Sequence, residues 1–138
     1  MKAFSPIQIR WNEPLGKPEC PYMRRWVFLL FGFSIRIHKW VRSDDKQHFH
    51  DHAWDFVTLV LRGSYTDITE AGQQKMSAGT IQFRKAEHKH YVEVPKEGAL
   101  TLLLCGRPRR KWGFWVRDKF WRPLRYFSKF GLPPCDLQ

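Results

Sequence analysis

Residues 50–67 read HDHAWDFVTLVLRGSYTD, and the rest of the chain is best interpreted outward from this stretch. It opens with an H-x-H pair, continues as a strand-length run of β-branched and aromatic residues, and turns at Gly63 into a second such run. Another H-x-H pair, His88 and His90, ends residues 79–90, GTIQFRKAEHKH. Because side chains two positions apart on a strand share one face, each pair presents its imidazoles together.

Further runs of strand length surround these two stretches, with turn residues about every 8–12 positions. The runs that we expect to form strands are residues 26–31, 34–40, 54–61, 64–69, 80–84, 88–94, 99–105 and 112–116. Short strands at this spacing are typical of an antiparallel sandwich or barrel. Residues 121–130 predict a short helix that packs aromatic side chains onto the barrel, and residues 42–47 a polar loop. The proline-rich residues 1–25 predict an irregular arm with at most a short strand at 7–11.

The chain has 138 residues, of which 43% are hydrophobic and 16% aromatic, so it can bury a core. We expect a single domain over residues 1–138, with the barrel core at about residues 26–116. The net charge of +11 is uneven: residues 1–42 carry eight basic against two acidic residues, and residues 107–138 carry nine against two. Basic flanks attract anionic partners without selecting among them.

The three cysteines, Cys20, Cys105 and Cys135, are odd in number and show no C-x-x-C spacing. This pattern predicts no disulfide framework and a reducing, cytoplasmic location. The longest apolar stretch, residues 26–35, is far shorter than the roughly 20 apolar residues that span a bilayer, so we expect no membrane segment. Residues 26–31 are apolar on both faces, which favours a homodimer because an exposed apolar strand seeks a partner.

The two histidine stretches resemble the two sequence motifs of the cupin superfamily. The first motif is H-x-H, three or four residues, a glutamate, six residues and a glycine, and His50, His52 and Gly63 fit it. The second runs from a glycine to a histidine eleven positions later, as from Gly79 to His90. The resemblance implies an all-β, cupin-type double-stranded β-helix, or jelly-roll barrel, with His50, His52 and His90 as ligands of one divalent metal ion. The chain looks like a family of small cupins found in bacterial and phage genomes.

Departures from the first motif leave the ligand set open. Its glutamate position is Phe56, and Asp55, one residue earlier, would be a fourth ligand only if the strand bulged to turn it inward. If His48 and His50 were the ligand pair instead, Asp55 would follow at the longer spacing of the motif. In the second stretch, His88 is the corresponding alternative to His90.

An all-histidine triad is similar to that of the thiol dioxygenases within the superfamily. The resemblance therefore implies a mononuclear non-haem oxygenase that acts on a small molecule, with Fe(II) as the leading metal and Zn, Ni or Mn as alternatives. The basic charge favours an anionic substrate. Asp51 and Tyr65 are the candidates to assist catalysis, by orienting a ligand histidine or donating a proton, and Tyr91 and Glu93 are further candidates.

Two other classes of function remain open. Some cupin relatives are sugar-nucleotide epimerases or isomerases that use a His–Tyr or His–Asp pair without metal, although the doubled H-x-H spacing argues against that reading. The second class is a binding protein without chemistry. Residues 107–111, RPRRK, lead into basic residues interleaved with aromatics, a pattern that suits single-stranded nucleic acid but also an aromatic cap with solvated cations.

Overall fold

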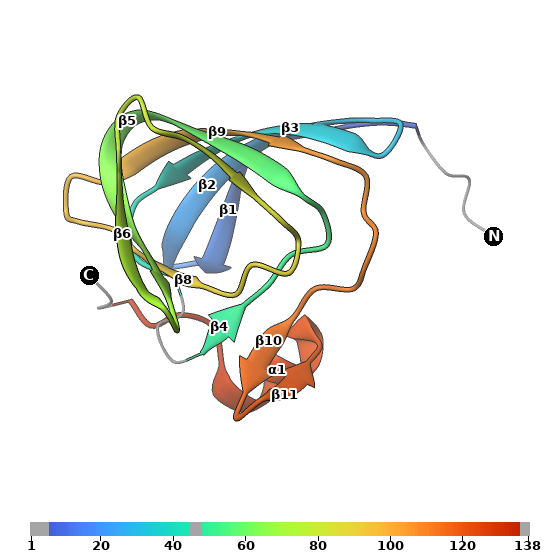
Figure 1. Ribbon diagram of the computed structural model, residues 1–138, viewed down its shortest axis with the longest axis vertical. Helices are drawn as coiled ribbons and strands as arrows, with labels where there is room; N and C mark the ends of the chain where they lie inside the picture. The colour runs from blue at the N-terminus through green and yellow to red at the C-terminus, as the bar shows by residue number, and fades with distance from the viewer. Residues whose placement is uncertain (1–5, 45–47, 136–138) are drawn as a thin grey trace.

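The structure, a computed structural model, describes residues 6–44 and 48–135, so the last part of the polar loop expected at 42–47 lies outside it. Within the described residues the chain forms strands that curl into a barrel, with one short helix beside it (Figure 1). The elements are β1 (Ile7–Lys17), β2 (Cys20–Leu30), β3 (Phe33–Trp40), β4 (Phe49–His50), β5 (Phe56–Thr69), β6 (Gly72–Ser77), β7 (Ile81–Arg84), β8 (Tyr91–Glu93), β9 (Ala99–Cys105), β10 (Phe114–Val116), β11 (Lys119–Trp121) and α1 (Pro123–Phe130). The strand pairs are antiparallel, which confirms the all-β prediction.

The N-terminal segment is a long hairpin, so the prediction of an irregular arm is wrong. Strands β1 and β2 pair from Ile7 opposite Leu30 to Lys17 opposite Cys20. Pro14 is tolerated because β1 is the edge strand of the sheet, where one side of the strand needs no hydrogen-bond donors. Pro21 lies at the start of β2, before the pairing of β2 with β3 begins at Met23. Register shifts after Arg10 and after Leu15 absorb the remaining irregularity.

The main sheet has the strand order β1-β2-β3-β9-β5-β6, and β7 and β8 also pair with β5. Strand β5 is the centre of the fold because its first half pairs with β9 and β7, while its second half pairs with β6 and β8. A small sheet, β11-β10-β4, lies next to α1, below the barrel in Figure 1. A bridge between His50 and His90 joins β4 to the residue that precedes β8.

One extra residue in β5 reverses which side chains face the interior. Val60 lies opposite Thr101 and Arg62 opposite Leu100, so Leu61 forms a bulge between them. Even-numbered residues of β5 are buried before the bulge, whereas Tyr65 and Asp67 are buried after it. This change of parity turns the Asp67 carboxylate into the barrel.

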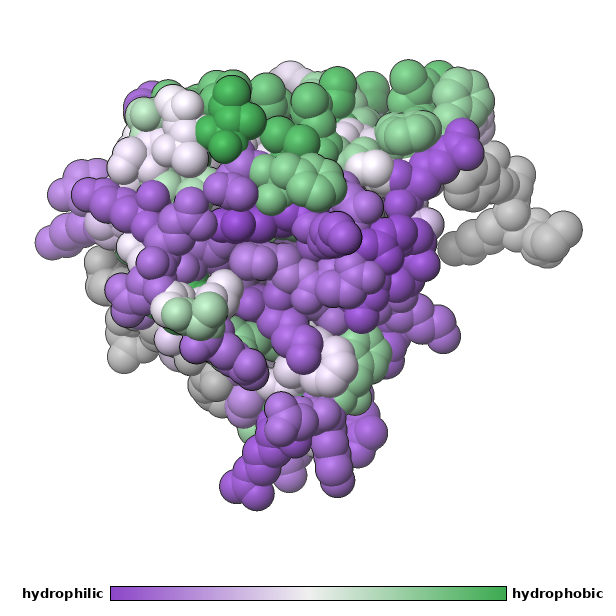
Figure 2. Space-filling model, in the orientation of Figure 1, coloured by the Kyte–Doolittle hydropathy of each residue, from purple (hydrophilic) through white to green (hydrophobic). Residues whose placement is uncertain are grey.

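The two faces of the main sheet differ in character. The inner face supplies a buried cluster made of Val60, Tyr65, Met76, Val92, Val94 and Ala99. The outer face is also apolar, and a row of side chains crosses six neighbouring strands in direct register. The row is Ile9, Phe28, Ile35, Leu104, Val57 and Phe83. Figure 2 shows this hydrophobic surface along one side of the molecule, above a largely hydrophilic surface.

The C-terminal residues form the expected aromatic and helical cap. Proline at the start of α1 is compatible with the first helical turn, and Gly131, with φ of 79°, ends the helix. Tyr126 is fully buried and its ring stacks on Phe114 with centroids 3.8 Å apart. The helix is therefore held by aromatic packing against β10.

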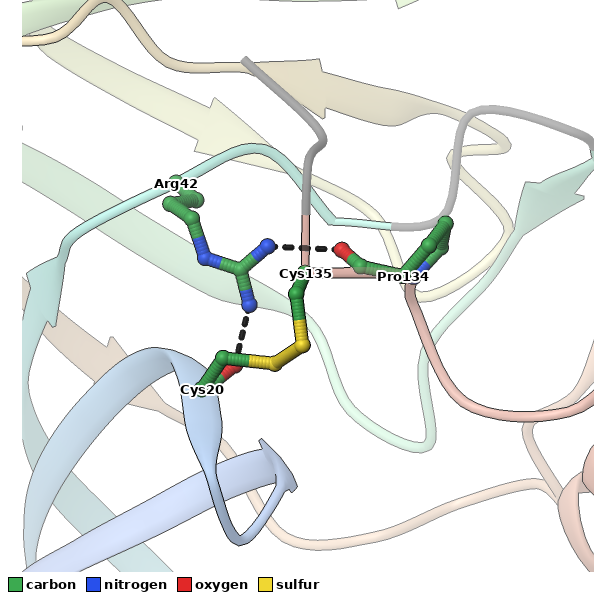
Figure 3. The surroundings of a disulfide bond; sticks show 4 residues. All are labelled: Cys20, Arg42, Pro134 and Cys135. Carbon is green, nitrogen blue, oxygen red and sulfur yellow. Dashed lines mark hydrogen bonds between the residues drawn. A yellow bond between two sulfur atoms is a disulfide. The ribbon is translucent and has the colours of Figure 1, made fainter.

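A disulfide joins Cys20 at the start of β2 to Cys135 near the C-terminal end, with Cα atoms 5.5 Å apart (Figure 3). Arg42 lies beside it and donates hydrogen bonds to the carbonyls of Pro134, at 2.6 Å, and of Cys20. The prediction of no disulfide is therefore wrong. The odd count arises because Cys105 is buried in the barrel as a free thiol. The pairing removes the cysteine argument for a reducing compartment.

Among the described residues, the single helix is too short to cross a lipid bilayer.

Candidate metal centre

Three histidines converge inside the barrel. His50 ends β4, His52 follows two residues later, and His90 immediately precedes β8. The ring centroids lie 4.8 Å apart for His50 and His90, 4.9 Å for His52 and His90, and 5.4 Å for His50 and His52. One ring nitrogen from each lies within 4.8 Å of the others. The structure thus brings together the three histidines that the sequence singled out.

Backbone hydrogen bonds fix the loops that carry these rings. The amides of His50 and His90 each donate to the carbonyl of the other, at 2.9 and 3.0 Å. The amide of His52 donates to the carbonyl of Ala86 at 2.9 Å. Both H-x-H stretches are therefore held to each other before any ligand binds.

Asp67 orients His90. Its Oδ1 lies 2.5 Å from His90 Nδ1, and its Oδ2 lies 2.9 Å from His88 Nε2 and 2.9 Å from a guanidinium nitrogen of Arg84. Burial opposes ionisation of Asp67, but hydrogen bonds from His88 and His90 hold the pKa of its carboxyl well below the ordinary value. An ionised carboxylate only accepts hydrogen bonds, so His90 Nδ1 carries the proton and Nε2 keeps a free lone pair.

The imidazoles of the triad are neutral. Burial lowers the pKa of His50 and of His52 well below 6.5, and it also lowers the pKa of His90 although Asp67 acts in the opposite direction. His52 Nδ1 is buried and has no hydrogen-bond partner within the described ranges. Asp44, on the other side, places its Oδ2 3.9 Å from His50 Nδ1. Neutral rings with an unpartnered nitrogen suit a metal ion, because only the neutral imidazole is a ligand.

Two other groups of side chains also have ligand atoms close together. Asp67, His88 and His90 form one of these groups. The Asp67 carboxylate already accepts hydrogen bonds from both histidines and from Arg84, which is the role of a residue that orients a ligand histidine. Glu19, Cys20 and Cys135 form the other, and there the disulfide occupies both sulfur atoms. The three-histidine group is therefore the best candidate for a metal ion among the described residues.

Asp55 does not reach this group, because the strand does not turn it inward. Its Oδ1 accepts hydrogen bonds from the amide of Ala86 at 2.8 Å and from the guanidinium of Arg109 at 2.7 Å. Arg109 also forms an ion pair with Glu87. The hydrogen bond from Arg109 to Asp55 lowers the pKa of the Asp55 carboxyl. The side chain is 37% exposed and forms a surface ion pair with Arg109, so the structure does not bring Asp55 together with the three histidines.

Asp51 is completely engaged away from the histidine rings. Its Oδ1 accepts from the amide of Gly113 at 2.8 Å and its Oδ2 from the indole of Trp115 at 2.9 Å. Arg110 lies 2.9 Å from the same carboxylate and also binds the carbonyl of His52. Through these contacts Asp51 fastens the HDH loop to the C-terminal segment, and its expected role in catalysis stays a prediction.

The tyrosines and Glu93 likewise lie outside the histidine group. Tyr65 belongs to the buried core cluster, and burial raises the pKa of its hydroxyl, which hydrogen-bonds Thr58. Tyr91 stacks on Phe49 with centroids 5.4 Å apart. Glu93, two residues on, shares the face of Tyr91, which is opposite to the face of the buried Val92. Tyr65 thus has the packing role of a core residue.

His48 is not brought to the triad either. Its Nδ1 lies 2.8 Å from the hydroxyl of Tyr126, and its ring packs 4.8 Å from that of Phe130. The alternative ligand pair of His48 and His50 therefore does not form, because His48 belongs to the contact with α1.

Sequence reasoning missed the residues that support the triad and line the sheet beside it. Asp67 was read only as part of a returning strand, yet its spacing from Tyr65 is the same two-residue spacing that drew attention to the histidines. Arg36 and His38 alternate with Ile35 and Ile37 along β3. This alternation predicts one polar and one apolar face of the strand, and it could have been recognised in the sequence.

The basic residues after β9 are mostly held against the protein. Arg107 donates to the carbonyl of Phe31, while Arg109 and Arg110 pair with acidic side chains. Arg125 lies 4.3 Å above the ring of Trp121, and Lys89, which precedes β8, lies 3.7 Å above the ring of Trp115. These contacts match the aromatic cap with cations packed over it.

No family model and no curated protein matches this sequence. Solved structures do resemble it in shape. The Fe(II) form of HppE aligns with 72% of this chain at 11% identity and a TM-score of 0.57, and the chain spans 56% of the length of that protein. KdgF from Halomonas sp. aligns with 74% of this chain and 94% of its own, at 17% identity and a TM-score of 0.52. A structure from a study of the DMSP lyases RdDddP and RnDddQII aligns with 72% of this chain and 56% of its own, at 16% identity and a TM-score of 0.55.

These neighbours are cupin-fold proteins, and the chain has the cupin fold. At such low identities the likeness extends to the fold and not to any one activity.

Proposed function

We propose that this cupin binds one divalent metal ion through His50, His52 and His90. The observation that carries the proposal is the convergence of three neutral imidazoles, one buried and two partly buried, whose candidate ligand atoms lie within 4.8 Å of one another. Asp67 supports it, because metal-bound histidines usually donate their other N–H to a carboxylate or carbonyl acceptor.

Fe(II) is the leading metal, and Zn, Ni and Mn remain compatible with a three-histidine site because ligand type alone does not select among them. HppE, one of the fold neighbours, is described as an Fe(II) protein. A bound iron ion would supply redox chemistry toward dioxygen and a small molecule, and on this basis we propose a mononuclear non-haem oxygenase. Zinc would instead supply Lewis-acid chemistry.

The chain's own residues prepare this site in two ways. Asp67 holds the proton at His90 Nδ1 and thereby keeps the ring in one tautomer and one orientation. Phe56 packs against His52 with ring centroids 4.6 Å apart, and Trp54 lies 5.8 Å from the same ring. These aromatic side chains limit the access of water to the histidines.

The direct test is the metal content of protein purified without a histidine tag. We expect about one equivalent of metal in the native chain and none in a His50→Ala/His52→Ala variant. His48→Ala is the matched control, since His48 contacts α1 and should leave the metal content unchanged. Iron would lead to oxygen-consumption assays, and zinc, nickel or manganese would keep the site but reject the oxygenase. A native chain that stays metal-free after anaerobic reconstitution would refute the proposal.

The outer face of the sheet fits a second copy of this chain. Its exposed apolar side chains include Phe28 at 37%, Ile35 at 48%, Leu104 at 51% and Phe83 at 54% exposure. With their exposed apolar neighbours on β1 and β2 they form one continuous apolar surface, and a standard interface takes about 800 Å² from each partner. Because the row is uncharged, two copies can oppose it without burying unpaired charge, so we propose a homodimer.

A further inference from the structure

The inner face of β3 carries polar side chains where a barrel interior is usually apolar. Ser34, Arg36 and His38 point to the same side as the buried core of the sheet. His38 lies between Arg25 on β2 and Thr101 on β9, directly opposite each of them in register. This inner polar cluster is separate from the three-histidine group.

Two atoms of the cluster are buried without a partner. Neither His38 Nε2 nor Thr101 Oγ1 makes a hydrogen bond within the part of the chain that the structure describes. Burial, together with the positive charges of Arg36 and Arg25, lowers the pKa of His38 to about 3, so the ring is neutral. Buried polar groups normally have partners, and two adjacent exceptions indicate that a ligand or an ordered water supplies them.

Arg36 adds a positive charge that no carboxylate among the described residues neutralises. Its Nε donates to Ser34 Oγ at 3.0 Å, and its guanidinium carbon lies 4.8 Å from the ring centroid of Trp54. No carboxylate among the described residues pairs with it, whereas the neighbouring Arg25 lies 2.5 Å from Glu13. Burial lowers the pKa of Arg36, and a hydrogen bond to the thiol of Cys105 opposes this shift only in part. A planar guanidinium in this state is suited to bind an oxyanion through two parallel hydrogen bonds.

The cluster adjoins the candidate metal centre. Trp54 lies between the two, with its ring centroid 4.8 Å from the Arg36 guanidinium carbon and 5.8 Å from the ring of His52. The two sites are therefore separated by a single indole ring, a span that a small elongated organic molecule can cover.

We propose that Arg36, with His38 and Thr101, binds the carboxylate of a small organic acid, whose other end lies beside His50, His52 and His90. The position of that other end rests on the proposed function, whereas the carboxylate site does not. Arg36 is the one cation of the cluster without a carboxylate partner, which matches the single charge of a carboxylate better than the double charge of a phosphate. His38 and Thr101 supply the additional hydrogen bonds that a bound oxyanion requires.

The test is a titration of the ¹⁵N-labelled, metal-free full chain followed by NMR. Acetate, inorganic phosphate and chloride serve as probes at equal ionic strength. We expect acetate to shift the Arg36 Nε–H and Trp54 Nε1–H signals saturably, and chloride to leave them unchanged. Tighter binding of phosphate than of acetate would overturn the assignment to a carboxylate. Identical effects of acetate and chloride, or shifts confined to exposed residues, would leave only ordered water in the cluster and overturn the proposal.

Arg36→Gln should weaken acetate binding by about tenfold or more, since it removes a charge-assisted pair of hydrogen bonds. Arg62→Gln is the matched control, because Arg62 is exposed on β5 and loses the same charge elsewhere. Equal weakening in both variants would overturn the proposal. Should Arg36→Gln fail to fold, the location of the shifts in the native chain still decides.

Repeating the titration with zinc-loaded protein separates this inference from the proposed function. Zinc binding together with acetate shifts at Arg36 supports both. Acetate shifts without any zinc binding leave the carboxylate site standing and refute the metal proposal. Zinc binding without acetate shifts overturns the carboxylate site alone.

Discussion

Replacing Cys20 and Cys135 by serine should destabilise the chain substantially. The disulfide joins residues 115 positions apart, so it closes nearly the whole chain into one loop. In the chain-entropy description, a closed loop of this length restricts the unfolded state by about 4.8 kcal/mol, with measured losses of about 2–4 kcal/mol being typical. The native contacts of Arg42 with Pro134 and Cys20 do not alter this expectation, because the effect arises in the unfolded chain.

The assay is urea unfolding of the native chain and the double variant without reductant. We expect the variant to lose about 2–5 kcal/mol and to show a larger m-value, because its unfolded state is less compact. A thiol titration of denatured, unreduced native protein should detect only Cys105 of the three cysteines. A loss below about 1 kcal/mol with an unchanged m-value would refute the reasoning. Three reactive thiols would show that the bond is absent from the protein.

Asp67→Asn should weaken zinc binding by about 10- to 100-fold, because His90 loses its anionic acceptor. A chelator competition measures this affinity, and an equal loss in the exposed control Asp118→Asn would contradict the prediction. Acid should destabilise the native chain more steeply than a His38→Gln variant. The pKa of His38 is about 3 in the folded chain, against an ordinary value of 6.5, so unfolding between these two pH values takes up a proton. The free energy of unfolding therefore falls by at most about 1.4 kcal/mol per pH unit as the pH drops from 6.5 to about 3. Parallel denaturation curves at each pH measure this, and identical slopes for the two chains would exclude the effect. Ile35→Glu should convert a dimer into a monomer of 16.6 kDa in light scattering, while Leu124→Glu, at an 88% exposed position on α1, should not; a native chain that is already monomeric would reject the interface.

The parts of the fold that follow from local patterns could be predicted from the sequence. Strand β9 is marked by an apolar run between two glycines, and α1 begins at a proline and ends at a glycine. Strand β5 is marked by β-branched and aromatic residues, but it continues through Gly63, where the sequence predicted a turn between two separate strands. The N-terminal hairpin could not be predicted in this way. Whether a proline-rich segment such as β1 forms a strand depends on its place at the edge of the sheet, which is a property of the whole topology.

The same division holds for the candidate site. Two H-x-H pairs are a local signal, and they led to His50, His52 and His90. The contacts of Asp51 could not be predicted, because its partners, Gly113 and Trp115, lie more than sixty positions away in sequence. The disulfide was missed for the same reason, since spacing alone does not show that two distant cysteines meet. Contacts between distant segments are decided by packing, on which a single sequence carries little direct information.

Because of the bulge at Leu61, the site depends on the number of residues in β5 as well as on which residues are present. If this one residue were deleted, every later position of β5 would move to the opposite face of the strand. Asp67 would then point outward and His90 would lose its acceptor, although every histidine of the triad would still be present. A comparison of relatives that scores only the identity of histidines would accept such a chain as equivalent. The number of residues between His52 and Asp67 should therefore be read as part of the site's specification.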